Sequence, residues 1–72
     1  MKKTFVIEDL DCAHCAAKME DEIKKIPEVT FVSVNFLAAK LTLEANDTEF
    51  EQALKKALDI IKTVEPDCKV VI

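Results

Sequence analysis

Glycine is absent from this chain of 72 residues, as are tryptophan and tyrosine, and proline occurs only twice. Without glycine, tight turns depend on asparagine, aspartate and proline, and a residue with positive φ is expected to be Asn or Asp. A long apolar run is also missing, since no segment approaches the roughly 20 residues that cross a bilayer. No signal-peptide pattern follows Met1. We therefore expect no direct insertion of this segment into a membrane.

Positive charge is in short supply as well. The chain has 10 basic and 14 acidic residues, for a net charge of -4. Because nucleic-acid binding calls for a basic face, we expect no nucleic-acid partner. Half of the residues are hydrophobic, which fits a globular chain. A chain this short buries only about 60% of its unfolded surface, so we expect a single domain with a small core and no deep enzymatic cleft.

The hydrophobic pattern predicts the element order β-α-β-β-α-β. Alternation predicts strands at 4–8, 32–36, 41–43 and 68–72, and spacings of three and four predict helices at 13–26 and after residue 48. The helical stripes expected in the core are Ala16, Met19, Ile23 and Ile26, then Phe50, Ala53, Leu54, Ala57, Leu58 and Ile61. The order predicts an α+β, ferredoxin-like fold, in which two helices cover one face of a four-stranded antiparallel sheet.

Local signals set the ends of these elements. Pro27 ends the first helix, and Thr48 with Glu51 fits a capping box for the second. Phe31 falls outside the core alternation and is expected to be exposed. In this topology, segments 9–15 and 64–68 meet at one edge of the sheet, so we expect them to be neighbours in space.

The chemistry of the chain is concentrated in Cys12-Ala13-His14-Cys15, where a loop enters a helix. Amides at a helix N-terminus favour the thiolate, and two thiolates spaced by three residues converge on one soft ion, such as Cu(I) or Zn(II). A structural zinc site of four cysteines needs a second such pair, which this chain lacks. A thioredoxin-type redox pair usually has Trp, Gly and Pro around it. Metal capture is therefore favoured over a thiol–disulfide oxidoreductase or a chance pair.

The segment from Phe5 to Ala16 resembles the metal loop of the heavy-metal-associated domain family, which includes copper chaperones and the N-terminal domains of metal-exporting P1B-type ATPases. The usual loop of that family is Gly-Met-Thr-Cys-x-x-Cys, and here Asp9, Leu10 and Asp11 stand for its first three residues. The resemblance extends over residues 1–72, as a single domain. It implies metal binding through Cys12 and Cys15 by a non-catalytic module.

Asp11 directly before Cys12 resembles the Asp-Cys-x-x-Cys loop of zinc-, cadmium- and lead-exporting ATPases. Two thiolates and a carboxylate leave a net site charge of -1 around Zn(II) but -2 around Cu(I), and Cu(I) gains little from a hard oxygen ligand. Asp11 therefore favours Zn(II), Cd(II) or Pb(II), with Cu(I) as the alternative. The other interpretation of Asp11 is a helix N-cap.

Two further side chains are candidate ligands with simpler interpretations. His14 lies between the cysteines, at a position expected to face water. Cys68 shares a face with Val70 and Ile72, so core packing competes with a role as a third thiolate.

The resemblance also predicts the setting of the domain. It implies a monomeric cytoplasmic domain at the N-terminal part of a longer membrane transporter. There it would regulate, or hand ions to, the membrane-embedded and cytoplasmic domains of the parent ATPase. The alternative is a free-standing metallochaperone, for which Cu(I) is the candidate ion.

Overall fold

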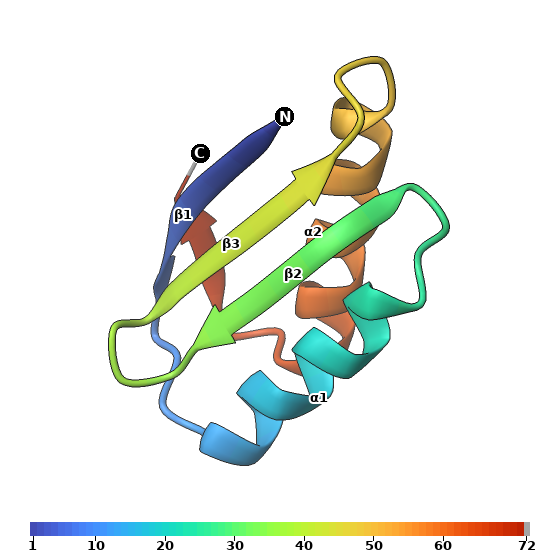
Figure 1. Ribbon diagram of the computed structural model, residues 1–72. Coiled ribbons are helices and arrows are strands. Elements are labelled where there is room, and N and C mark those ends of the chain that lie inside the picture. The colour runs from blue at the N-terminus through green and yellow to red at the C-terminus, as the bar shows by residue number, and fades with distance from the viewer. Residues whose placement is uncertain (72) are drawn as a thin grey trace.

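The computed structural model describes residues 1–71 and has the predicted order β-α-β-β-α-β (Figure 1). Its elements are β1 (Lys2–Glu8), α1 (Ala13–Lys24), β2 (Val29–Asn35), β3 (Lys40–Ala45), α2 (Phe50–Val64) and β4 (Lys69–Val71). The ferredoxin-like fold predicted from the hydrophobic pattern is confirmed. None of the helices in residues 1–71 is long and apolar enough to cross a membrane.

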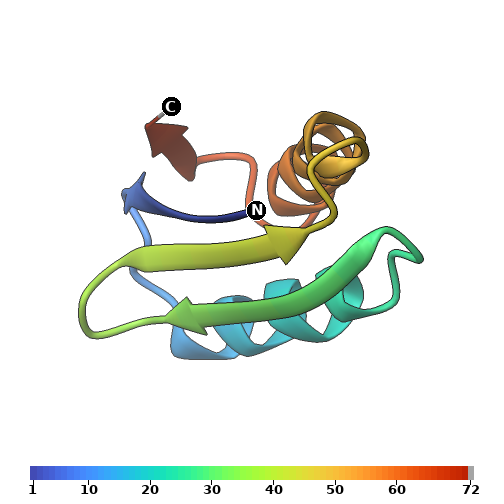
Figure 2. The same cartoon turned by 45° about the horizontal axis from the view of Figure 1, so that its top comes forward.

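The sheet is antiparallel and has the strand order β2-β3-β1-β4, which can be followed from edge to edge in Figure 2. The register pairs Phe5 of β1 with Leu41 of β3, and Ile7 of β1 with Val70 of β4. Since successive side chains of a strand point to opposite faces, this register gathers the apolar residues of the strands on one face.

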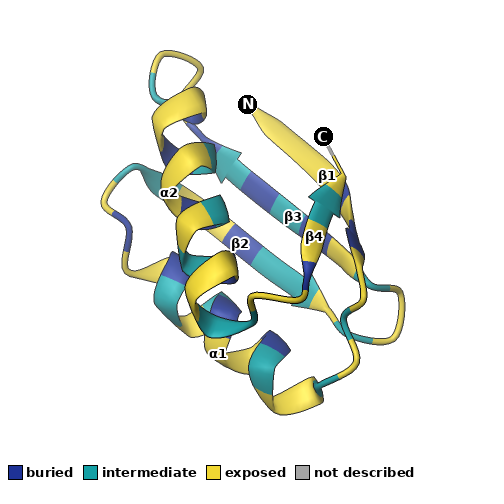
Figure 3. Ribbon diagram, turned by 180° about the vertical axis from the view of Figure 1, so that it is seen from behind, coloured by how far each residue is buried: buried dark blue, intermediate teal, exposed yellow. Residues whose placement is uncertain are grey.

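Both helices cover that face, as the view from behind shows (Figure 3). The core contains every residue of the predicted stripe of α1 and, from α2, the residues Phe50, Ala53, Ala57 and Ile61, while Leu54 packs partly buried against it. Met19 and Ile23 are fully buried, so truncation of either to alanine would cost about 2–5 kcal/mol. Phe31 is 46% exposed, as predicted, and lies beneath the ammonium group of Lys2.

Three connections gather at the end of the sheet where β1 finishes. They are the loop before α1, the β2–β3 turn and the turn between α2 and β4; the first two lie together at the lower left of Figure 1. The Ile7 amide donates to the Ala39 carbonyl at 2.8 Å, which ties the β2–β3 turn to the end of β1. The predicted proximity of segments 9–15 and 64–68 is confirmed by two contacts described below.

Positive φ angles follow the prediction at one of two positions. Asp9 has φ 61°, as expected for Asp in a chain without glycine, but the other residue is Ala39, with φ 52°. The expectation of Asn or Asp is therefore wrong at Ala39. Asn35 serves that turn in another way, because its side-chain oxygen accepts the Ala38 amide at 3.0 Å.

The predicted helix ends need two corrections. The capping box of Thr48 and Glu51 does not form: Glu49 is the N-cap of α2 and makes no side-chain capping bond. Asn46 instead donates to the Glu49 carboxylate at 3.2 Å, which uses the polar groups within the turn. The first helix ends at Lys24, two residues before the predicted Ile26, and the amide of its C-cap Lys25 closes the last turn. The predicted end of the last strand at Ile72 lies outside the described residues.

Candidate metal centre

Cys12 occupies the N-cap position of α1. Its backbone is extended, with φ -129° and ψ 109°, and its Sγ accepts the Cys15 amide at 3.2 Å. The side chain of Cys15, then its backbone amide, then the His14 amide, each donate to this sulfur and lower the pKa of the Cys12 thiol. These donors outweigh burial and the charge of Glu65, which act in the opposite direction. Cys12 is therefore the thiol of the pair that ionises first.

Cys15 lies in the first turn of α1, half-buried against the core. Its Sγ is 3.6 Å from Oε2 of Glu65, in the turn after α2. The hydrogen bond to Cys12, followed by burial and the charges of Cys12 and Glu65, raises the pKa of the Cys15 thiol to about 12. Cys15 therefore keeps its proton at neutral pH, and a metal ion must displace it.

Cys68 is buried directly before β4, and its Sγ donates to the Asp9 carbonyl at 3.3 Å. Burial, together with the charges of Glu65, Asp11, Asp9 and Asp67, raises the pKa of its thiol. Cys68 thus lies next to the metal loop and packs with the core at the same time, as both sequence interpretations required.

Asp11 is exposed and directly precedes the cap. Its interpretation as the N-cap of the first helix is wrong, because Cys12 takes that position and supplies the capping atom. The Asp11 carboxylate is therefore not engaged in capping. Its negative charge helps to raise the pKa of the Cys68 thiol. His14 is exposed on the first turn, at the position expected to face water.

Glu65 is the site residue that sequence reasoning missed. Topology placed segment 64–68 beside the metal loop, but it did not indicate which of the acids in Glu65-Pro66-Asp67 faces a cysteine. The sequence carries no signal that distinguishes the two acids, and the structure does so through the end of α2. Glu65 is the C-cap of α2, and its amide still bonds to Ile61, so its side chain leaves the helix toward the loop, whereas Asp67 follows the proline and is exposed.

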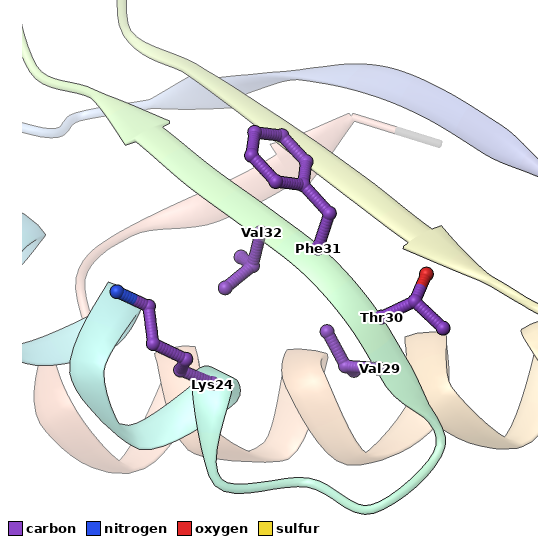
Figure 4. A pocket seen from close by; sticks show the side chains of 5 residues that line it. All are labelled: Lys24, Val29, Thr30, Phe31 and Val32. Atoms are coloured by element: carbon purple, nitrogen blue, oxygen red, sulfur yellow. The ribbon is translucent and has the colours of Figure 1, made fainter.

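The cysteine site is an open corner of the molecule. A cavity of about 300 Å³ lies at the other end of α1, lined by Lys24, Val29, Thr30, Phe31 and Val32 (Figure 4). Within residues 1–71, no group of three or more His, Cys, Asp or Glu side chains is already arranged to hold a metal ion. The site therefore presents two thiols and nearby carboxylates on a surface, and any third ligand must move to reach the ion.

Comparison with known proteins identifies a family. The family model described as "Heavy-metal-associated domain" matches residues 4–69. The chain belongs to the heavy-metal-associated domain family. The resemblance carried by the metal loop and the element order is thereby confirmed, and with it a relationship to heavy-metal P-type ATPases.

Two relatives of this chain carry names that describe ATPases transporting cadmium, or cadmium, zinc and cobalt. The cadmium, zinc and cobalt-transporting ATPase of Bacillus subtilis is 33% identical over 66 residues, which cover 92% of this chain and 9% of the ATPase. The probable cadmium-transporting ATPase of Listeria monocytogenes is 43% identical over 54 residues, covering 72% of this chain and 8% of that protein. The chain thus spans less than a tenth of the length of these two relatives.

One similar solved structure is that of a copper-loaded domain. The N-terminal domain of a potential copper-translocating P-type ATPase from Bacillus subtilis, in its Cu(I)-loaded state, is 28% identical, with a TM-score of 0.77. The alignment covers 99% of this chain and 84% of that domain. The comparisons therefore support a heavy-metal-binding domain and leave its preferred metal to the chemistry of the site.

Proposed function

We propose that this domain captures a thiophilic divalent ion, Zn(II), Cd(II) or Pb(II), through Cys12 and Cys15 as part of a heavy-metal-exporting P-type ATPase. The observation that carries the proposal is the Glu65 carboxylate beside the Cys15 thiol. It places a hard, anionic oxygen next to one of the two soft sulfurs, and a movement of the Glu65 side chain would bring it to the ion.

Capture begins at Cys12. Its sulfur is held at the helix N-terminus by the Cys15 amide, and its lowered pKa favours the thiolate that makes the first bond. The second bond requires the Cys15 thiol to lose its proton. Glu65, in contact with that thiol, supplies a negative charge that attracts the cation. Metal binding is thus coupled to the release of the Cys15 proton.

Charge balance favours a divalent ion at this site. Two thiolates and one carboxylate carry -3, which leaves -1 around a divalent ion and -2 around Cu(I). A site with excess negative charge and a hard oxygen is poorly matched to Cu(I), which is satisfied by two soft thiolates. The exposed Asp11 adds a further negative charge to the same bias, whether it binds the ion or only sets the local charge.

The second candidate is Cu(I) binding in a metallochaperone or copper ATPase. It is favoured by the likeness to the Cu(I)-loaded domain from Bacillus subtilis. The acidic groups beside Cys12 and Cys15 argue against it, because nothing in a two-coordinate Cu(I) site needs them. The divalent ion is therefore the preferred cargo, and regulation of the ATPase or delivery to it is the proposed role.

Competitive metal binding at fixed pH tests the proposal. Purified domain is titrated with Zn(II), Cd(II), Pb(II) and Cu(I) against chelators of known affinity, and Glu65→Gln is compared with the unmodified chain. We expect Glu65→Gln to weaken Zn(II) and Cd(II) binding by about tenfold, the lower range for an outer-shell partner, and to leave Cu(I) within about twofold.

Glu49→Gln is the matched control, since Glu49 lies at the distant end of α2. A wild-type domain that prefers Cu(I) over Zn(II) and Cd(II), once each is compared with its own chelator, would contradict the divalent assignment. Equal losses for all four ions in Glu65→Gln would remove the selectivity argument.

A further inference from the structure

The turn between α2 and β4 contacts the loop before α1 at two places. At its first residue, the Glu65 carboxylate contacts the Cys15 thiol at 3.6 Å, and at its last, the Cys68 thiol donates to the Asp9 carbonyl at 3.3 Å. The turn is itself closed by the Cys68 amide, which donates to the Glu65 carbonyl at 3.1 Å. Because one short, closed turn makes both contacts, it fixes the start of the loop relative to the helix that the loop enters.

The second of these contacts holds Asp9, whose backbone conformation needs support. Its φ of 61° is unfavourable for a residue with a Cβ atom, although Asp tolerates it better than most. Such a conformation persists only where the surrounding contacts hold it. At Asp9 the chain leaves β1 and turns into the segment that carries Cys12, so the orientation of the Asp9 peptide sets the direction in which the loop departs.

The buried position of Cys68 restricts the sulfur that bonds to the Asp9 peptide. Its side chain is 9% exposed and packs in the core, so its sulfur has little freedom to move. A thiol that donates a hydrogen bond carries its proton, whereas a metal ligand is a thiolate without one. The observed contact and a ligand role therefore exclude each other in any single state of the site.

We propose that Cys68 is a positioning residue of the metal loop: its thiol holds the Asp9 carbonyl, and with it the left-handed turn from which Cys12 is presented. The inference rests on the proposed function, since it assigns Cys68 to the support of the same site. It differs from the third-thiolate interpretation because the contact exists before any metal binds and needs no movement of the sulfur.

The first experiment uses the metal-free domain. Cys68→Val fills the same space without a donor, and Cys68→Ser keeps a donor. We expect NMR order parameters of the amides of residues 10–12 to fall in Cys68→Val, from rigid-backbone values of about 0.85 toward about 0.6, and to stay near the wild-type values in Cys68→Ser. Phe50→Leu is the control: it disturbs the core at the other end of α2 and should leave the loop unchanged.

The second experiment adds Cd(II) alone. We expect Cys68→Val to bind it about three- to tenfold more weakly and Cys68→Ser to stay within about twofold of wild type. The thiolate-to-Cd(II) absorption should be the same in wild type and both variants, because two cysteines bind the ion in each. The Ser variant decides between donor and ligand by itself, including where Cys68→Val fails to fold.

Three results would overturn the assignment. They are a loop in Cys68→Val as ordered as in wild type, a failure of Cys68→Ser to restore that order, and a loss of about one third of the thiolate absorption in Cys68→Ser, which would make Cys68 a ligand. A wild-type domain that binds no Cd(II) would defeat the proposed function instead. The order parameters of the metal-free domain would still decide the Cys68 contact.

Discussion

Cys15 and Glu65 are separated by 50 positions in the chain, and the thiol of one lies 3.6 Å from the carboxylate of the other. The contact joins the first turn of α1 to the end of α2, so it depends on the packing of both helices against the sheet. It also contributes to the raised pKa of Cys15, after the hydrogen bond to Cys12 and burial, which are the larger causes. This difference between a thiol with a lowered pKa and a thiol with a raised pKa underlies the first two predictions.

Replacing either cysteine should abolish tight binding. Cys12→Ser and Cys15→Ser each substitute a hydroxyl, which keeps its proton and offers a hard oxygen in place of a soft sulfur. We expect each change to lower Cd(II) affinity by more than the roughly 10- to 100-fold loss typical of residues that only support a ligand. Chelator competition measures the loss, and Cys68→Ser is the control. Tight binding that survives in either variant would disprove two-point thiolate capture.

Metal affinity should fall as the pH is lowered. The pKa of Cys15 is raised to about 12, so this thiol stays protonated from pH 6 to 8, and the ion must displace its proton throughout that range. The pKa of Cys12 is lowered, so its proton adds to the competition only below that value. Each displaced proton changes the apparent affinity by about tenfold per pH unit. Competition titrations at several pH values should therefore give a slope of at least about one, and a flat profile would contradict thiolate ligation.

The β2–β3 turn offers a prediction about stability. Ala39 has φ 52°, which costs roughly 1–2 kcal/mol for a residue with a Cβ atom, while glycine would lose roughly 0.5–1 kcal/mol in chain entropy. We expect Ala39→Gly to raise the free energy of unfolding by about 0.5–1 kcal/mol in urea denaturation. Ala38→Gly is the matched control, since its φ is not positive, and it should be neutral or destabilising. If both changes destabilise the domain alike, Ala39 is not strained.

The parts of the fold that repeat along the chain were predictable from sequence. Met19 and Ile23 are buried because the apolar spacing of a helix directs them to one side, and Leu41 and Leu43 because strand alternation does the same. No other residue has to be known for these assignments. The same pattern located Cys12 and Cys15 where a loop enters a helix, as the structure has them.

The rest depended on contacts between distant segments. Ala39 adopts positive φ in the β2–β3 turn, and its own carbonyl accepts the Ile7 amide. This constraint comes from β1 and not from the sequence of the turn. Glu65 faces Cys15 only because α2 ends where it does against α1. An N-cap role was the alternative interpretation of Asp11, because oxygen is the usual capping atom, whereas the sulfur of Cys12 takes the role here.

The last prediction concerns Asp11, which the structure leaves exposed and without a capping role. If its carboxylate joins the site, Asp11→Asn should weaken Zn(II) and Cd(II) by about tenfold and leave Cu(I) nearly unchanged, because Zn(II) prefers four ligands and Cu(I) is content with two thiolates. Since Cys12 provides the cap, neither Asp11→Asn nor Asp11→Ala should incur the roughly 1 kcal/mol loss of a missing N-cap.

Chelator competition for Zn(II) and Cu(I), together with urea denaturation of both variants, measures the two effects separately. Asp67→Asn is the control for charge alone, because Asp67 is exposed in the neighbouring turn and belongs to the same acidic surface. If Asp67→Asn weakens Zn(II) as much as Asp11→Asn does, Asp11 contributes only its charge and is not a ligand. If Zn(II) and Cu(I) affinities move in parallel in both Asp11 variants, the residue does not select the metal, and the copper alternative gains accordingly.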